Sequence, residues 1–141
     1  MIAVDTNILV YAHREELAQH AAARARVTAL AEGDAPWAIP VFCLGEFVRV
    51  VTHPRVFDPP HTVDEACAAL DRVLESPSVR ILNPGDRFWT MLAAAVREGA
   101  AMGNLAFDAQ VAALCRESGV SALLTEDRDF DRFPWLRTEH L

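Results

Sequence analysis

Four acidic residues of this sequence occupy positions where carboxylates can do chemistry. Asp5 follows a short apolar segment, Asp127 lies just past another, and Asp108 lies near the start of an expected helix. Glu46 stands inside a segment that is apolar nearly all round, where a carboxylate must be paired, protonated or bound to a cation. Carboxylates gathered in one place repel one another unless a cation joins them. We therefore consider these residues together as candidate metal ligands.

The residue types predict a hard divalent cation. Carboxylate oxygens suit Mg²⁺ or Mn²⁺, and no His or Cys pair has the spacing of a zinc site. Two such ions can activate a water and stabilise the leaving oxygen in phosphodiester hydrolysis. The acidic segment that begins at Asp127 superficially resembles an EF-hand loop, but its sixth position is Arg132 and its twelfth is Thr138, so a calcium loop is excluded.

Each acid also has an ordinary structural explanation. Asp5 can be the N-cap of a helix, and Asp108 can be a first-turn acid that the helix dipole favours. Glu46 can pair with Arg49 one turn on or be modestly exposed at the surface. Asp127 can belong to a solvated acidic loop. The joint pattern is stronger than its parts, because ligands bind beyond the carboxyl ends of the strands in an open α/β sheet.

Short apolar segments alternate with helical patterns along the chain. This alternation predicts a parallel sheet of about four strands with helices on both faces and right-handed connections. The expected strands cover residues 2–4, 37–39, 79–82 and 122–124, and the expected helices cover residues 8–12, 17–31, 41–51, 63–74, 88–96 and 107–115. From residue 125 onward the sequence predicts a polar loop.

Several local features make sharper predictions. Thr62 and Glu65 have capping-box spacing before the expected helix at 63–74. Asp86 is expected to cap the next helix, with Trp89 on its buried face. The three cysteines, which are expected to be buried and unpaired, are Cys43, Cys67 and Cys115.

Composition limits the class of protein. The 141 residues, 52% of them apolar, predict one domain over 1–141 with one core. No apolar run approaches the roughly 18 residues of a membrane span, and the N-terminus has no basic region of a secretory signal, so we expect a cytoplasmic protein without a membrane contact. The net charge of −7 argues against a general nucleic-acid binder but not against a nuclease that holds a metal.

Four segments resemble the motifs of the PIN-domain family, specifically VapC-type toxins of bacterial toxin–antitoxin systems, in a form similar to those of actinobacteria. In chain order they read MIAVDTNILVYA (1–12), EFVRVVTHP (46–54), GNLAFDA (103–109) and LTEDRDF (124–130). Any one motif is weak, but four in order over essentially the whole chain are specific.

The resemblance implies a three-layer α/β/α fold with a four- or five-stranded parallel sheet. It implies a Mg²⁺- or Mn²⁺-dependent endoribonuclease acting on RNA such as tRNA, rRNA or mRNA, a homodimer, and a small VapB-type antitoxin. Asp5, Glu46 and Asp108 match the family's most consistent acids, Asp127 matches the more variable fourth position, and Asp129 is an alternative or additional ligand.

The resemblance also assigns supporting roles. Small polar residues that would orient the carboxylates are Thr6, Asn7 and Thr125. By position only, the candidates for contacts with flanking phosphates are Arg14, Arg49 and Arg128. Each of these arginines is equally explained as an internal partner of the acids. Whether one or two metals bind stays open.

Other classes fit less well. A receiver domain needs a lysine near its phosphorylated aspartate, and this chain has no lysine. A HAD-type phosphatase needs an Asp-x-Asp nucleophile, but Asp5 is followed by Thr6 and Asn7. DNA-directed PIN-like nucleases generally carry more acids and larger insertions. The alternative outside the enzymes is a PIN-fold module that binds RNA or protein without turnover.

Overall fold

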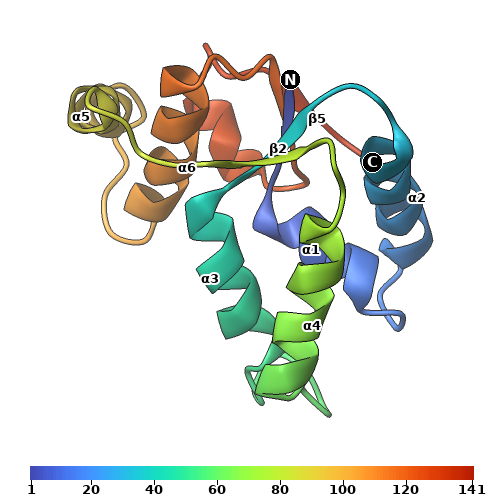
Figure 1. Cartoon of the computed structure of the whole chain (residues 1–141). Helices are drawn as coiled ribbons and strands as arrows, with labels where there is room; N and C mark the ends of the chain where they lie inside the picture. The colour runs from blue at the N-terminus through green and yellow to red at the C-terminus, as the bar shows by residue number, and fades with distance from the viewer.

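A computed structural model describes all residues, 1–141, as an α/β protein with one parallel sheet (Figure 1). The strands are β1 (Ile2–Val4), β2 (Trp37–Pro40), β3 (Val79–Leu82), β4 (Ala122–Leu124) and β5 (Thr138–Glu139). The α-helices are α1 (Thr6–His13), α2 (His20–Glu32), α3 (Val41–Val51), α4 (Val63–Leu74), α5 (Phe88–Glu98) and α6 (Leu105–Glu117), and a 3₁₀ helix covers Arg128–Arg132.

The strand order shows where a ligand can bind at the edge of the sheet. The five strands run β3-β2-β1-β4-β5, and every pairing is parallel. The chain leaves β1 toward β2 on one side and returns to β4 on the other, so β1 and β4 flank the switch point of the sheet. Ligands of open α/β sheets bind at this point, beyond the carboxyl ends of the strands.

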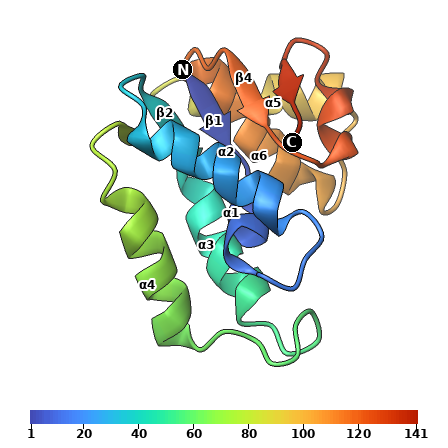
Figure 2. The same cartoon turned by 90° about the vertical axis from the view of Figure 1, so that its right-hand side faces the viewer.

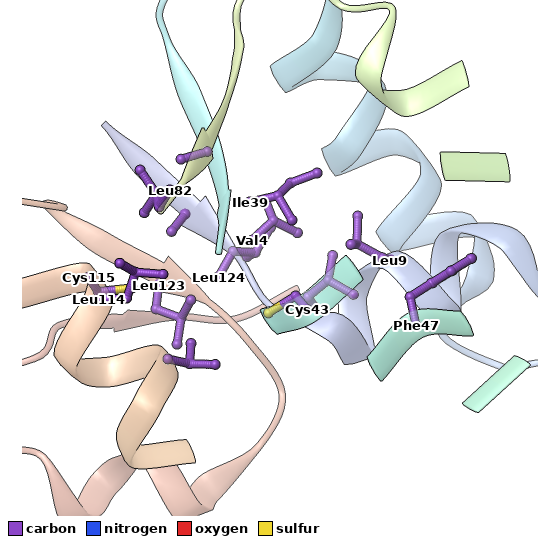
Figure 3. Packing of buried hydrophobic residues seen from close by; sticks show 14 of the residues in the cluster. Val4, Leu9, Ile39, Cys43, Phe47, Leu82, Leu114, Cys115, Leu123 and Leu124 are labelled. Atoms are coloured by element: carbon purple, nitrogen blue, oxygen red, sulfur yellow. The ribbon is translucent and has the colours of Figure 1, made fainter. Parts of the chain in front are cut away.

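Helices cover both faces of the sheet and bury a common core (Figure 2). Helix α1 packs against α2 and α3, whereas α5 packs against α6. Leu9 of α1 and Phe47 of α3 lie on one side of the strands, and Leu114 and Cys115 of α6 lie on the other (Figure 3). The expected three-layer fold is therefore confirmed, because helices cover both faces of the sheet. Parallel strands that are buried on both faces require such apolar cover. None of the helices combines the length and apolar character that crossing a bilayer requires.

Local sequence signals predicted some elements closely. Helices α3 and α4 have the expected bounds, and the capping box of α4 is present: the Glu65 amide donates to Thr62 Oγ1 at 3.1 Å and the Thr62 amide donates to Glu65 Oε2 at 2.7 Å. The expected helix at 17–31 begins only at His20.

Other local predictions were wrong. Asp86 does not cap α5, which begins at Phe88 without a side-chain cap. Trp89 is 72% exposed, because α5 packs its other flank on α6. Cys67 is exposed on α4, although Cys43 and Cys115 are buried and all three are free. The expected terminal loop contains the 3₁₀ helix and β5.

Two glycines with contrasting surroundings give a test of the packing. A Cβ on Gly99 would lie 2.6 Å from Cε1 of Phe133, a ring that is fully buried and cannot move aside, whereas a Cβ on Gly45 would meet nothing within 4 Å. We expect Gly99→Ala to lower the free energy of unfolding by about 1–3 kcal/mol, and Gly45→Ala, inside α3, to raise it by about 0.5–1 kcal/mol. Urea unfolding of both variants measures this, and equal effects would contradict the packing described.

Candidate active site at the carboxyl edge of the sheet

Asp5 is the first residue after the central strand β1, and the fold buries it. Its amide donates to the carbonyl of Leu124 at 3.0 Å, which continues the pairing of β1 with β4 by one residue. Its side chain accepts from the Thr6 amide at 2.7 Å and so caps α1. The carboxylate therefore caps α1, as its position in the sequence allows. It also lies at the switch point of the sheet, where a ligand can bind.

Asn7 and Thr125 hold the other oxygen of Asp5. Asn7 Nδ2 and Thr125 Oγ1 donate to Asp5 Oδ2 at 2.9 and 2.7 Å. Asn7 Nδ2 also donates to Thr125 Oγ1 at 3.1 Å, and the Asp127 amide donates to the same hydroxyl oxygen at 3.0 Å. One hydroxyl thus links the carboxylate after β1 to the backbone that carries the acid after β4. Both residues lie where they can orient the carboxylates, as the sequence predicted.

Glu46 reaches the same region from the middle of α3. Thr6 Oγ1 donates to Glu46 Oε2 at 2.7 Å, and Arg49 Nη2 donates to Oε1 at 3.2 Å. Its side chain is 41% exposed and is paired with Arg49, so the ordinary explanation that the sequence offered for Glu46 is present in the structure. The helix turns its Gly45 and Arg49 outward and leaves Glu46 at the rim of a cleft.

One cleft of about 400 Å³ collects all four predicted acids. Its polar lining comprises Asp5, Thr6, Asn7, Glu46, Asp108 and Asp127. Asp108 comes from the first turn of α6, after the left-handed turn at Gly103 (φ +61°). Asp127 caps the 3₁₀ helix by accepting from the Asp129 amide at 2.8 Å. Asp129 itself does not line the cleft.

The rest of the lining is apolar. Its residues, from α1, the α1–α2 loop, α3 and the loop after α3, are Val10, Tyr11, Leu17, Val50, Val56 and Phe57. No arginine, lysine or histidine lines the cleft. The cleft therefore combines oxygen ligands with apolar surface.

Comparisons with known proteins agree with this geometry. The PIN-domain profile matches residues 2–136. The chain belongs to the PIN-domain family. The ribonuclease VapC43 of Mycobacterium tuberculosis is 40% identical over 140 residues, which cover 99% of this chain and 95% of that protein. The ribonuclease VapC31 of the same organism is 33% identical over 137 residues, covering 97% and 96%.

Solved PIN-domain structures share the fold. The VapBC2 structure from Rickettsia felis, described as bound to a DNA fragment from its promoter, matches with a TM-score of 0.72 and 21% identity, over 99% of this chain and 98% of that one. The VapC20 structure from M. tuberculosis, described as a sarcin–ricin loop cleaving toxin, matches with a TM-score of 0.67 and 23% identity, over 93% of each chain.

Burial and mutual repulsion raise the pKa values of two acids of this PIN domain. Burial, opposed in part by the hydrogen bonds from Thr125 and Thr6, raises the pKa of Asp5 to about 6, and the charges of Glu46 and Asp127 add to the rise. Burial and the charges of Asp127 and Asp129 raise the pKa of Asp108 to about 7. The cleft therefore holds more negative charge than its own hydrogen bonds balance, and it favours a cation.

The donor set fits a hard divalent ion held partly by water. No three acidic, histidine or cysteine side chains converge closely enough to enclose an ion by themselves. Mg²⁺ usually binds through one or two carboxylates and keeps several waters, so a full protein cage is not what it requires. Asp108 makes no hydrogen bond that perturbs its pKa, which leaves its oxygens free for a ligand.

Two of the three candidate arginines form ion pairs with acidic residues of the same chain. Arg14 is buried, donates to Glu16 and to the Pro59 carbonyl, and lies over the ring of Phe57 with Cζ 4.1 Å from its centroid. Arg49 pairs with Glu46. Arg128 is exposed on the 3₁₀ helix and lies outside the cleft lining.

Sequence reasoning missed the C-terminal brace of the site. The Thr125 amide donates to the Glu139 carbonyl at 2.9 Å, His140 Nδ1 lies 2.6 Å from the Thr125 carbonyl, and the Leu141 amide donates to Glu126 Oε1 at 2.7 Å. These contacts fix the backbone between β4 and Asp127. They use mainly backbone groups, which leave no signal in the pattern of side chains.

The raised pKa values predict how the stability of the metal-free PIN domain depends on pH. Between the ordinary pKa of 3.8 and the folded values of about 6 for Asp5 and about 7 for Asp108, the folded chain holds protons that the unfolded chain releases. The free energy of unfolding should therefore fall as the pH rises through this window. Urea unfolding in EDTA from pH 4 to pH 8 measures it.

Asp108→Asn tests how much the ionised Asp108 carboxylate contributes to this pH dependence. The variant should be more stable than the wild type at pH 8 by about 1 kcal/mol, allowing for the partial exposure of Asp108, and nearly equal at pH 4. Mg²⁺ should raise the wild-type unfolding midpoint more at pH 8 than at pH 5, because protons compete with the metal, and should barely affect the variant. Asp71→Asn, an exposed acid on α4, is the control. A pH-independent midpoint would refute the electrostatic description.

Proposed function

We propose that residues 1–141 form one catalytic domain, a Mg²⁺- or Mn²⁺-dependent endoribonuclease and the toxin of a VapBC-type pair. The observation that carries this proposal is the convergence of Asp5, Glu46, Asp108 and Asp127, from four separate segments, on one cleft at the switch point of the sheet. Full-length identity of 40% to a protein named ribonuclease VapC43 supports RNA as the substrate.

The residues of the chain have distinct tasks in this mechanism. Asp5, Asp108 and Asp127 would hold one or two metals, directly or through water, and Glu46 would contact a metal or its water from α3. A bound Mg²⁺ or Mn²⁺ would supply activation of a water and neutralisation of the scissile phosphate. Asn7 and Thr125 keep Asp5 Oδ2 in one orientation through their hydrogen bonds, and Thr6 does the same for Glu46 Oε2. Asp129, outside the cleft lining, would at most be an additional ligand.

The partners follow from the relatives. Neighbouring structures are described as VapBC complexes, some bound to DNA, which supports a small VapB-type antitoxin for this chain. The VapC20 structure is described as that of a sarcin–ricin loop cleaving toxin, so ribosomal RNA is one candidate substrate beside tRNA and mRNA. We propose that the activity is cytoplasmic, where these candidate RNAs are found.

We also propose a homodimer that pairs through α5 and α6. A hollow of about 200 Å³ on this face has a mainly apolar lining, to which Arg97 and Gln110 also contribute. Its apolar residues are Trp89, Leu92, Ala93 and Val96 of α5 and Ala106 of α6. Trp89 is 72% exposed, and an exposed apolar surface of this kind is typical of a protein interface.

Cleavage of total RNA by the purified chain tests the ribonuclease. The wild type should give discrete fragments with Mg²⁺ or Mn²⁺ and none with EDTA, and Asp108→Asn should lower the rate by more than about 100-fold. Asp108→Asn is cleaner than Asp5→Asn, because an amide at residue 5 would meet the donors of Asn7 and Thr125.

Thr125→Val extends this test to the residues that orient the metal ligands. It removes the donor to Asp5 Oδ2 and should lower the cleavage rate by about 10- to 100-fold, whereas Thr138→Val on β5 should not. Absence of cleavage by a folded, antitoxin-free wild type under either metal would favour the alternative, a PIN-fold binding module without turnover.

The dimer has its own test. Light scattering after size exclusion should find the wild type as a dimer and Trp89→Glu as a monomer, because a buried unpaired charge opposes association. Val63→Glu is the matched control, since Val63 is 65% exposed on α4, away from α5 and α6. A monomeric wild type, or a dimeric Trp89→Glu, would contradict this interface.

A further inference from the structure

We propose that His140, which follows the last strand of the sheet, is a positioning residue for the metal ligands and acts on them through Thr125. The proposal rests on the metal-dependent function proposed above and adds a residue to it. His140 does not line the cleft, so it acts without touching a metal or a substrate. Its hydrogen bond to the Thr125 carbonyl, and the bonds that Thr125 makes in turn, carry the proposal.

Thr125 joins two of the acids of the cleft. It is fully buried, and its hydroxyl donates to Asp5 Oδ2 at 2.7 Å and accepts from the Asp127 amide at 3.0 Å. A displacement of Thr125 would therefore move a hydrogen-bond donor of Asp5 and the backbone that carries Asp127 at the same time. The placement of the Thr125 backbone thus helps to set the separation of two metal ligands.

Both backbone polar groups of Thr125 bond to consecutive residues at the end of the sheet. Its amide donates to the carbonyl of Glu139, the last residue of β5, at 2.9 Å. Its carbonyl lies 2.6 Å from His140 Nδ1, and no other residue donates to it. Because a carbonyl oxygen only accepts, the imidazole carries a proton on Nδ1 here. A side chain thus supplies the donor that a buried carbonyl needs where the strand has ended.

Contacts on both sides of His140 fix the place from which its ring reaches the carbonyl. Glu139 Oε2 accepts from Arg26 of α2 at 2.8 Å, and the Leu141 amide donates to Glu126 Oε1 at 2.7 Å. The His140 side chain is itself 52% exposed, so it adds little to the hydrophobic core. Packing therefore does not explain why this ring is held against a buried carbonyl, whereas the hydrogen bond does.

Loss of the imidazole would loosen the metal ligands without removing any of them. The Thr125 carbonyl would have to find water or shift, and its hydroxyl would then hold Asp5 and Asp127 less firmly. Groups that orient metal ligands change the affinity for the metal, because ligands that are already in place lose less freedom on binding. We therefore expect His140 to act on metal affinity more than on the stability of the fold.

The test measures binding of Mn²⁺ without RNA. Electron paramagnetic resonance of free Mn²⁺ gives Kd for the purified wild type and for His140→Ala, and thermal unfolding in EDTA shows that both are folded. We expect His140→Ala to bind Mn²⁺ about 3- to 10-fold more weakly, less than the effect of losing a group that contacts the ligands directly. The Mg²⁺ concentration for half-maximal RNA cleavage should rise by the same factor.

Two amide variants separate the hydrogen bond from the bulk of the side chain. His140→Asn keeps an N–H donor on the atom bonded to Cγ, as in Nδ1, and should keep Kd within about twofold of the wild type. His140→Gln carries its amide one atom further out and should resemble His140→Ala. Equal Kd values for the Asn and Gln variants would contradict a role for the Nδ1 donor.

A double-mutant cycle tests the route through Thr125. Thr125→Val removes the hydroxyl but keeps the carbonyl, so adding His140→Ala to it should change Kd by less than about twofold. The full effect of His140→Ala in that background would overturn the route, and a wild-type Kd in His140→Ala would overturn the proposal. A wild type that binds no Mn²⁺ is a different result, since it would refute the metal-dependent function and this proposal with it.

Discussion

A carboxylate that is only 5% exposed, at the end of the central strand, is the constraint on which this structure depends. Burial by itself would drive Asp5 to its neutral form. The chain offsets part of that effect with the Thr6 amide, the Asn7 side chain and the Thr125 hydroxyl. These donors come together only if α1 begins directly after β1 and if β4 pairs beside it in register, with Ala3 opposite Leu123. The hydrogen bonds of the Asp5 side chain thus depend on the strand order that forms the switch point of the sheet.

The same arrangement explains why the site opposes the stability of the fold. Asp5 and Asp108 have raised pKa values chiefly because they are buried, and the charges of neighbouring acids add to the rise, so their ionised forms destabilise the folded chain when no cation is present. The apolar core on both faces of the sheet supplies the opposing stability (Figure 3). A functional site often destabilises the fold when its ligand is absent. Here a bound cation would offset the repulsion between the acids.

Many of the helices and strands could be predicted, because the sequence patterns that indicate them lie within single segments. The periodicity of α4 and its capping box lie within one segment, and the positions of Asp5 and Asp127 after apolar strands identify the ligand edge of a parallel sheet. The exposure of Trp89 could not be predicted, because periodicity marks an apolar stripe without saying which part of it another helix covers. The exposed fraction of Glu46 depends likewise on how α3 is rotated against α1.

The parts of the site that sequence reasoning missed are those assembled from distant segments with weak side-chain signals. Strand β5 has two residues and no apolar alternation, yet its backbone pairs with β4 and braces the segment before Asp127. Tyr11 lies on α1, Val56 and Phe57 are neighbours in the loop after α3, and each is an ordinary apolar residue in its own segment. Only the folded chain brings them into the lining of the same cleft as the carboxylates. The acids are therefore visible in the sequence as a chemical type, whereas the apolar lining beside them is assembled from distant segments in the folded chain.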